Sequence, residues 1–145
     1  MSQPNIWGST FEIGSTYGSR QFIDANTTVL RDGWIAVTWR DMATQVIKCQ
    51  ILNADGSGSG PVLDVSDAGE TALGPNIAAR SNGRFTIAYD VKNPSSGYTL
   101  KSKTFDVFQG SVEGASVIHE EDENASHSVA VTPFEDSLIY TFNDA

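Results

Sequence analysis

A short sequence pattern recurs three times along the chain, and this internal repeat constrains the fold more than any other feature. Each copy begins with a turn, continues with alternating apolar residues and ends with an aromatic residue. The copies occupy residues 32–39, 82–89 and 135–142, and they start about 50 residues apart. Alternation with a period of two is typical of β-strands. A repeat of this length is typical of a small sheet duplicated along the chain.

Each repeat has room for four short strands. The strand of the recurring pattern follows a predicted first strand at 27–31, 77–81 and 129–133. A third strand is predicted at 46–52 and 100–105, and a weaker fourth strand at 61–65 and 115–119. Asp32-Gly33 and Asn82-Gly83 are predicted hairpin turns, because these residue types tolerate a positive φ. The third repeat has Glu135-Asp136 there, so its turn should differ.

Four short strands in about 50 residues are what one blade of a β-propeller requires. The sequence therefore predicts an all-β, β-propeller-like fold with about three four-stranded blades per chain. We expect one repeat domain over 1–145, with units at approximately 27–74, 75–126 and 127–145. The last unit holds only two strands. Residues 1–26 are expected to complete it, since strand-like pieces lie at 6–13 and 20–23.

Three blades are too few to close a ring, so a six-bladed ring formed by homodimerisation is expected. The composite blade can form within one chain or by exchange between two chains, and the sequence leaves both open. A monomeric β-sandwich with pseudo-repeats is the alternative to a propeller.

The first repeat also resembles a known family. Its Asp-Gly turn, the strand 34–39 and the segment 51–56 (Ile-Leu-Asn-Ala-Asp-Gly) are similar to the ~50-residue repeats of large secreted bacterial proteins. Residues 28–66 match best, and 75–110 match loosely. The resemblance implies a β-propeller-like architecture and an extracellular or surface context, with no firm activity. In plan the chain is also similar to small bacterial lectins that assemble propellers from few-blade chains, although it has none of their motifs.

The formal net charge of −9 argues against two classes of partner. A strongly acidic chain repels phosphate backbones and anionic lipids, so neither nucleic acid nor an anionic membrane is expected. No apolar run approaches the ~20 residues that span a bilayer, so no membrane insertion is expected. The first residues lack the basic and apolar regions of a signal peptide, which predicts cytoplasmic synthesis and leaves later release or surface association open. Cys49 is the only cysteine, so no intrachain disulfide is expected.

An aromatic residue with a nearby carboxylate ends the second strand of every unit. The pairs are Trp39 with Asp41, Tyr89 with Asp90, and Phe142 with Asp144. Carbohydrates are recognised by both features, because an aromatic ring stacks on sugar ring carbons and a carboxylate accepts hydrogen bonds from hydroxyls. The alternative interpretation is that the rings fill the space between blades and the aspartates open turns.

Trp34 is a further candidate for ligand binding. It follows a hairpin glycine, at a position where the other units have Arg84 and Ser137, so a surface location is expected. There it would serve as a ligand platform or as part of a dimer interface. Together these features predict a non-enzymatic lectin that binds glycans. A structural or adhesive module that contacts another protein is the alternative function.

No cofactor, metal site or enzymatic activity is predicted. Residues 55–60 offer one carboxylate and a flexible backbone, and residues 120–124 form an acidic run, but neither segment has the spacing of an EF-hand or a calcium-binding nonapeptide. They are interpreted as a hairpin loop and a solvated surface loop. His119 and His127 lack zinc-ligand spacing, and no nucleophile elbow, P-loop or dinucleotide motif occurs. Carboxylates are plentiful, so a glycosidase pair stays open on chemistry alone.

Overall fold

The computed structural model describes residues 22–58, 60–95, 97–107, 110–111, 116–121, 130–134 and 137–141. Within these residues the regular structure consists of antiparallel β-strands and one short 3-10 turn, which confirms the all-β prediction. The predictions for residues 1–21 and for Phe142 and Asp144 lie outside the described residues.

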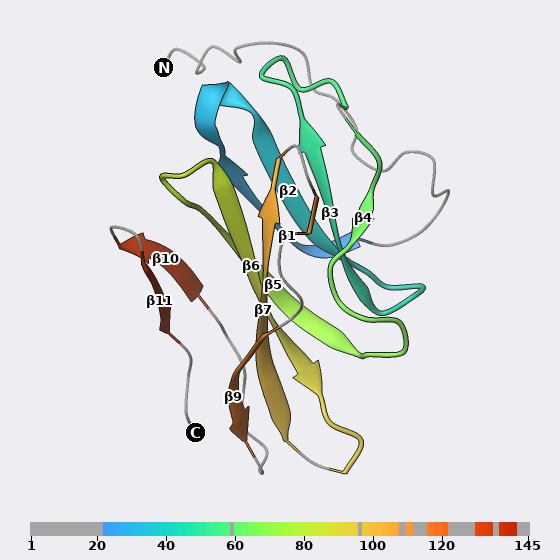
Figure 1. The fold of residues 1–145 in the computed structure, drawn as a ribbon. Coiled ribbons are helices and arrows are strands. Elements are labelled where there is room, and N and C mark those ends of the chain that lie inside the picture. Colours follow the sequence, from blue (N-terminus) through green and yellow to red (C-terminus); the bar gives the residue numbers. More distant parts are fainter. Residues whose placement is uncertain are drawn as a thin grey trace, which may run out of the picture.

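The strands form two successive sheets and a hairpin, in the order of the sequence repeats (Figure 1). The first sheet is an antiparallel meander of β1 (Phe22–Val29), β2 (Ile35–Asp41), β3 (Val46–Leu52) and β4 (Leu63–Asp64). In the second sheet β5 (Ala72–Ala79), β6 (Arg84–Lys92) and β7 (Tyr98–Asp106) follow in the same order. Two short strands, β8 (Gly110–Ser111) and β9 (Ser116–Glu121), both pair with β7. The hairpin consists of β10 (Ala130–Phe134) and β11 (Ser137–Thr141).

The first strand of each sheet is interrupted at the same place. The register shifts between Ile23 and Asn26 in β1, and between Leu73 and Asn76 in β5. Asp24 and Gly74 have φ values of 56° and 54° at these irregularities. Residues 22 and 23 were expected in the closing strands of the ring, but they begin β1 instead. The reason is the register shift between Ile23 and Asn26. It lets β1 continue through a stretch where the alternation of apolar and polar residues is broken.

The two glycine turns are also alike, and they differ from the predicted geometry. In the first, the Leu30 amide donates to the Trp34 carbonyl at 2.7 Å, which closes a loop over the 3-10 turn Arg31–Gly33. In the second, the Arg80 amide donates to the Arg84 carbonyl at 2.7 Å. Only the glycine of each Asp-Gly or Asn-Gly pair has a positive φ, so these are three-residue loops ending in a left-handed glycine. In the hairpin Phe134 pairs with Ser137; the turn predicted to differ, Glu135-Asp136, lies outside the described residues.

Replacing Gly83 with alanine isolates the conformational requirement of these loops. Gly83 has a φ of +81°, and a Cβ added there would meet nothing within 4 Å. The expected loss of about 1–2 kcal/mol in the free energy of unfolding therefore comes from backbone strain alone. Gly60→Ala is the matched control, because that position is equally open and has no positive φ. Urea denaturation measures both variants, and an equal stability for the two would contradict the assignment of the turn.

The two sheets pack face to face. We call the face of the first sheet that carries Trp39, and the face of the second that carries Tyr89, the front faces; the opposite faces are the rear faces. The rear face of the first sheet, with Ala36, Cys49 and Ile51, packs on the front face of the second. The residues of the second sheet in this contact include Ile77, Phe85, Ile87, Tyr89 and Phe105, of which the two phenylalanine rings stack at 5.3 Å between centroids.

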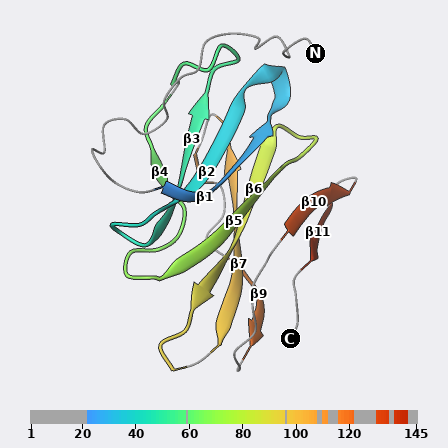
Figure 2. The same ribbon diagram turned by 180° about the vertical axis from the view of Figure 1, so that it is seen from behind.

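The β10–β11 hairpin covers the rear face of the second sheet (Figures 1 and 2). Val131, Leu138 and Tyr140 of the hairpin pack against Ala78, Ala88 and Leu100. The Val131 amide donates to Asn76 Oδ1 at 3.3 Å, and the Tyr140 hydroxyl donates to Ser102 Oγ at 3.2 Å. Each unit therefore covers the rear face of the unit before it. The first strands of successive units are neighbours, because β1 contacts β5 and β5 contacts β10.

Candidate functional site

The aromatic residues predicted to bind sugars are buried. Trp39 is 2% exposed and packs with Val37 and Leu52, while Tyr89 is 0% exposed and belongs to the core between the sheets. A ring with no exposed face cannot stack on a sugar without a change in the fold. The structure thus favours the alternative interpretation, in which these rings fill the space beside each sheet.

The two described carboxylates of the predicted pairs are also buried, and they do not form equivalent sites. Asp41 is 0% exposed, and its Oδ1 accepts a hydrogen bond of 2.9 Å from the Ala43 amide in the β2–β3 turn. Asp90 is 2% exposed and follows Tyr89 directly, so strand alternation directs it to the rear face while Tyr89 lies on the front. The structure therefore does not bring Tyr89 and Asp90 together. Trp34 is partly buried against the core between the sheets.

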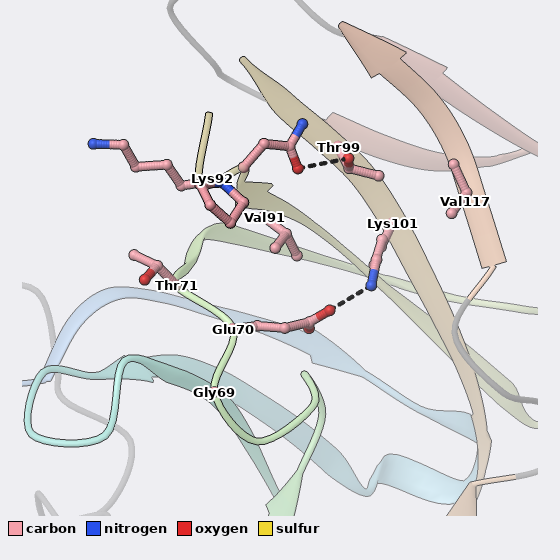
Figure 3. Close-up of a pocket in the computed structure, with 10 residues that line it drawn as sticks. Gly69, Glu70, Thr71, Val91, Lys92, Thr99, Lys101 and Val117 are labelled. Carbon is pink, nitrogen blue, oxygen red and sulfur yellow. Dashed lines mark hydrogen bonds and ion pairs between the residues drawn. The ribbon is translucent and has the colours of Figure 1, made fainter. Parts of the chain in front are cut away.

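An open cleft of about 600 Å³ lies where the first sheet passes into the second (Figure 3). One wall is the loop 69–71, which leads from the first sheet into β5. The other walls come from β6, β7 and the connection between them, and from β9. The lining residues are Gly69, Glu70, Thr71, Val91, Lys92, Asn93, Pro94, Thr99, Lys101 and Val117.

Two polar contacts order the side chains in this cleft. Glu70 and Lys101 form an ion pair, and their side chains are only 16% and 20% exposed. The Thr99 hydroxyl donates to Asn93 Oδ1 at 3.1 Å. Figure 3 shows both contacts side by side, with Val91 between them and Val117 on the neighbouring strand. The cleft thus offers a carboxylate, an ammonium group, an amide and hydroxyls beside apolar carbon.

Tyr89 links the cleft to the core. It pairs across the strands with Lys101, and its hydroxyl has no hydrogen-bond partner among the described residues. Burial raises the pKa of Tyr89, and the negative charges of Glu70 and Asp67 raise it further. Both effects favour the protonated form of the phenol. Glu70, which lines the cleft, thus also affects the pKa of the buried Tyr89 hydroxyl.

The sequence did not indicate the cleft residues, although one signal was present. Lys101 lies opposite Tyr89, and Lys48 lies opposite Trp39 at the equivalent position of the first sheet. Lys48 forms an ion pair with Asp64 at 2.5 Å. A lysine opposite the aromatic residue in both units is a recurring feature that the strand alternation could have revealed. The position of Glu70, in a loop between units, could not have been found in this way.

No candidate metal site occurs among the residues that the structure describes. Asp55 Oδ1 instead accepts hydrogen bonds from the Ser57 amide at 2.9 Å and from its hydroxyl at 2.6 Å. These bonds lower the pKa of Asp55. They fit the interpretation of the segment as a hairpin loop. The acidic run at 120–124 is described only for the backbone of Glu120 and Glu121 in β9.

Comparisons with known proteins gave no relatives: no family model, no curated protein and no solved structure matches the chain. The described residues include no helix that could cross a membrane.

Proposed function

We propose that this chain is a non-enzymatic carbohydrate-binding protein, a lectin, and that it binds its ligand in the cleft between the first and second units. The observation that carries the proposal is the lining of the cleft. The Thr99 hydroxyl and the Asn93 amide group are joined by a hydrogen bond. They line the cleft together with the apolar side chains of Val91, Pro94 and Val117. A sugar presents the same combination, since its hydroxyls exchange hydrogen bonds and its ring carbons need an apolar contact.

The cleft supports binding rather than catalysis. Glu70 is the single carboxylate among its described lining residues, and it is held in the ion pair with Lys101. Hydrolysis of a glycosidic bond ordinarily needs two carboxyl groups facing each other across the bond. No cysteine or histidine lies among the described lining residues either. We therefore assign no catalytic role to this cleft.

We further propose that the units are blades of a β-propeller and that two chains close a six-bladed ring. The packing of each unit on the rear face of the preceding one supports this arrangement, as does the adjacency of β1, β5 and β10. A ring of two chains presents the cleft at least twice. Two weak sites held at a fixed spacing give avidity for a surface rich in glycans.

A glycan array on the purified chain, repeated with EDTA, tests the proposed function. We expect selective binding that EDTA leaves unchanged. Thr99→Val removes the hydroxyl that orders Asn93 and should weaken binding about tenfold, the effect of about 1.4 kcal/mol. Thr44→Val is the matched control, because Thr44 is exposed in the β2–β3 turn, away from the cleft. Equal loss of binding in both variants would contradict the assignment to this cleft.

The alternative function is a structural or adhesive module that contacts another protein. The exposed apolar side chains of Phe134 and Ile139, which are 58% and 47% exposed, favour this alternative. A blank array with folded protein would reject the lectin proposal and leave this one.

A further inference from the structure

Four side chains from three adjacent strands form a small patch in the cleft, on the front face of the second sheet. Val91 of β6 pairs with Thr99 of β7, and Lys101 of β7 pairs with Val117 of β9. Residues that pair directly across antiparallel strands have their side chains on the same face, so the four lie together. Val91 and Thr99 are buried, whereas Val117 is 53% exposed. The patch therefore combines a fixed base with one exposed apolar side chain.

Hydrogen bonds within the chain already engage the side-chain oxygens beside this patch. Glu70 Oε1 accepts from Lys101, and Glu70 Oε2 accepts from the Asp67 amide at 3.0 Å. Asn93 Oδ1 accepts from the Thr99 hydroxyl at 3.1 Å. Each of these three oxygens thus has a donor from the chain itself, and less of its capacity as an acceptor is left for a ligand.

The donor groups at the patch keep more of their capacity. The bond between Asn93 and Thr99 uses the Asn93 oxygen, and the Asn93 amide nitrogen carries two N–H donors. An ammonium group has three N–H donors, and the ion pair with Glu70 uses one of those on Lys101. The cleft therefore favours a ligand group that accepts hydrogen bonds and also has an apolar part to place against Val117.

We propose that the cleft recognises sugars that carry an acetamido group. Such a group has a carbonyl oxygen that accepts hydrogen bonds, an N–H that donates one, and a methyl group. The oxygen accepts from Asn93 Nδ2 or Lys101 Nζ, and the methyl group packs on Val91 and Val117, which flank β7 on its two sides (Figure 3). The inference rests on the proposed function and names the ligand class of the same cleft.

A sugar with a carboxylate is the competing ligand class, because a carboxylate also accepts hydrogen bonds from amide and ammonium groups. Two observations favour the acetamido group. The exposed Val117 gains from contact with a methyl group, whereas a carboxylate loses hydration when it is placed against apolar carbon. The charge of Lys101 is already balanced by Glu70, and the net charge of −9 repels an anionic ligand.

Titrations of the purified chain with matched sugars test this inference. The probes are N-acetylglucosamine with glucose, N-acetylgalactosamine with galactose, and glucuronic acid. We expect the N-acetylated sugar of at least one pair to bind roughly tenfold more tightly than its parent sugar, by isothermal titration calorimetry. In saturation-transfer NMR the acetyl methyl group should receive the strongest transfer from the protein, because it lies against the two valines.

Two variants examine the two halves of the acetamido contact. Asn93→Asp keeps the oxygen that accepts from Thr99 and replaces the N–H donors with a second oxygen, so the preference for the N-acetylated sugar should fall about tenfold. Val117→Ser removes the apolar contact and should also reduce this preference. Val29→Ser is the matched control, because Val29 is 66% exposed on the first sheet and is not a lining residue of the cleft. Circular dichroism shows whether each variant is folded.

The outcomes separate this inference from the proposed function. Equal affinity for the N-acetylated and parent sugars, or tightest binding of glucuronic acid, would overturn the acetamido assignment and leave the proposed function intact. An unchanged preference in both Asn93→Asp and Val117→Ser would overturn it as well. A blank with every sugar, on folded protein, rejects the proposed function and the acetamido assignment together.

Discussion

Trp39→Ala and Tyr89→Ala are each expected to lower the free energy of unfolding by about 3–5 kcal/mol, as measured by urea denaturation. Trp39 is 2% exposed and Tyr89 is 0% exposed, so truncation leaves a large cavity in a packed region. A loss of this size is a large fraction of the stability of a small domain. We therefore expect both variants to show much lower urea midpoints or to fail to fold.

Two further variants separate packing from ligand binding at these positions. Tyr89→Phe keeps the ring and removes a buried hydroxyl that has no hydrogen-bond partner among the described residues, so stability should be equal or higher. Carbohydrate binding should also be unchanged. The double variant Trp39→Ala, Asp41→Ala should unfold. If it instead stayed folded and lost sugar binding, the pairs predicted from the sequence would be the true site.

Cys49 should make the chain sensitive to alkaline pH. Burial raises the pKa of this thiol from 9.0 to about 12. Above pH 9 the unfolded chain releases the proton while the native chain keeps it, so the native state loses stability as the pH rises towards 12. The expected slope is about 1.4 kcal/mol per pH unit, with burial of Tyr89 acting in the same direction above pH 10.

The measurement is the urea midpoint at pH 7, 9 and 10.5, for the wild type and for Cys49→Val. The variant removes the thiol and keeps a buried apolar side chain, so its stability should fall less steeply above pH 9. Parallel pH profiles for the two proteins would show that the Cys49 thiol does not contribute to the pH dependence.

The strand pattern was predictable because the hydrophobic alternation survives in every unit. Residues 46–52 and 100–105 were expected as third strands, and β3 and β7 occupy them. The start of β1 was not predictable, because the positive φ of Asp24 continues the strand through a non-alternating stretch. The hairpin turns were placed correctly, but only the glycine of each pair has a positive φ, although both residues of the pair tolerate one.

The candidate site was much less predictable than the strands. Alternation identified Trp39 and Tyr89 as recurring residues, but it could not say whether their side of the sheet is covered. The cleft was not predictable either, because Glu70, in the loop before β5, and Lys101, on β7, are 31 residues apart in the sequence and meet only in the folded structure. A contact between a loop and a strand of different units leaves no periodic signal in the sequence.

The irregularities at Asp24 and Gly74 also bear on how successive units are oriented. An irregularity of this kind increases the local twist of a strand, and the two strands that carry them, β1 and β5, contact each other. The rotation from the first unit to the second therefore depends on the backbone geometry at these two positions.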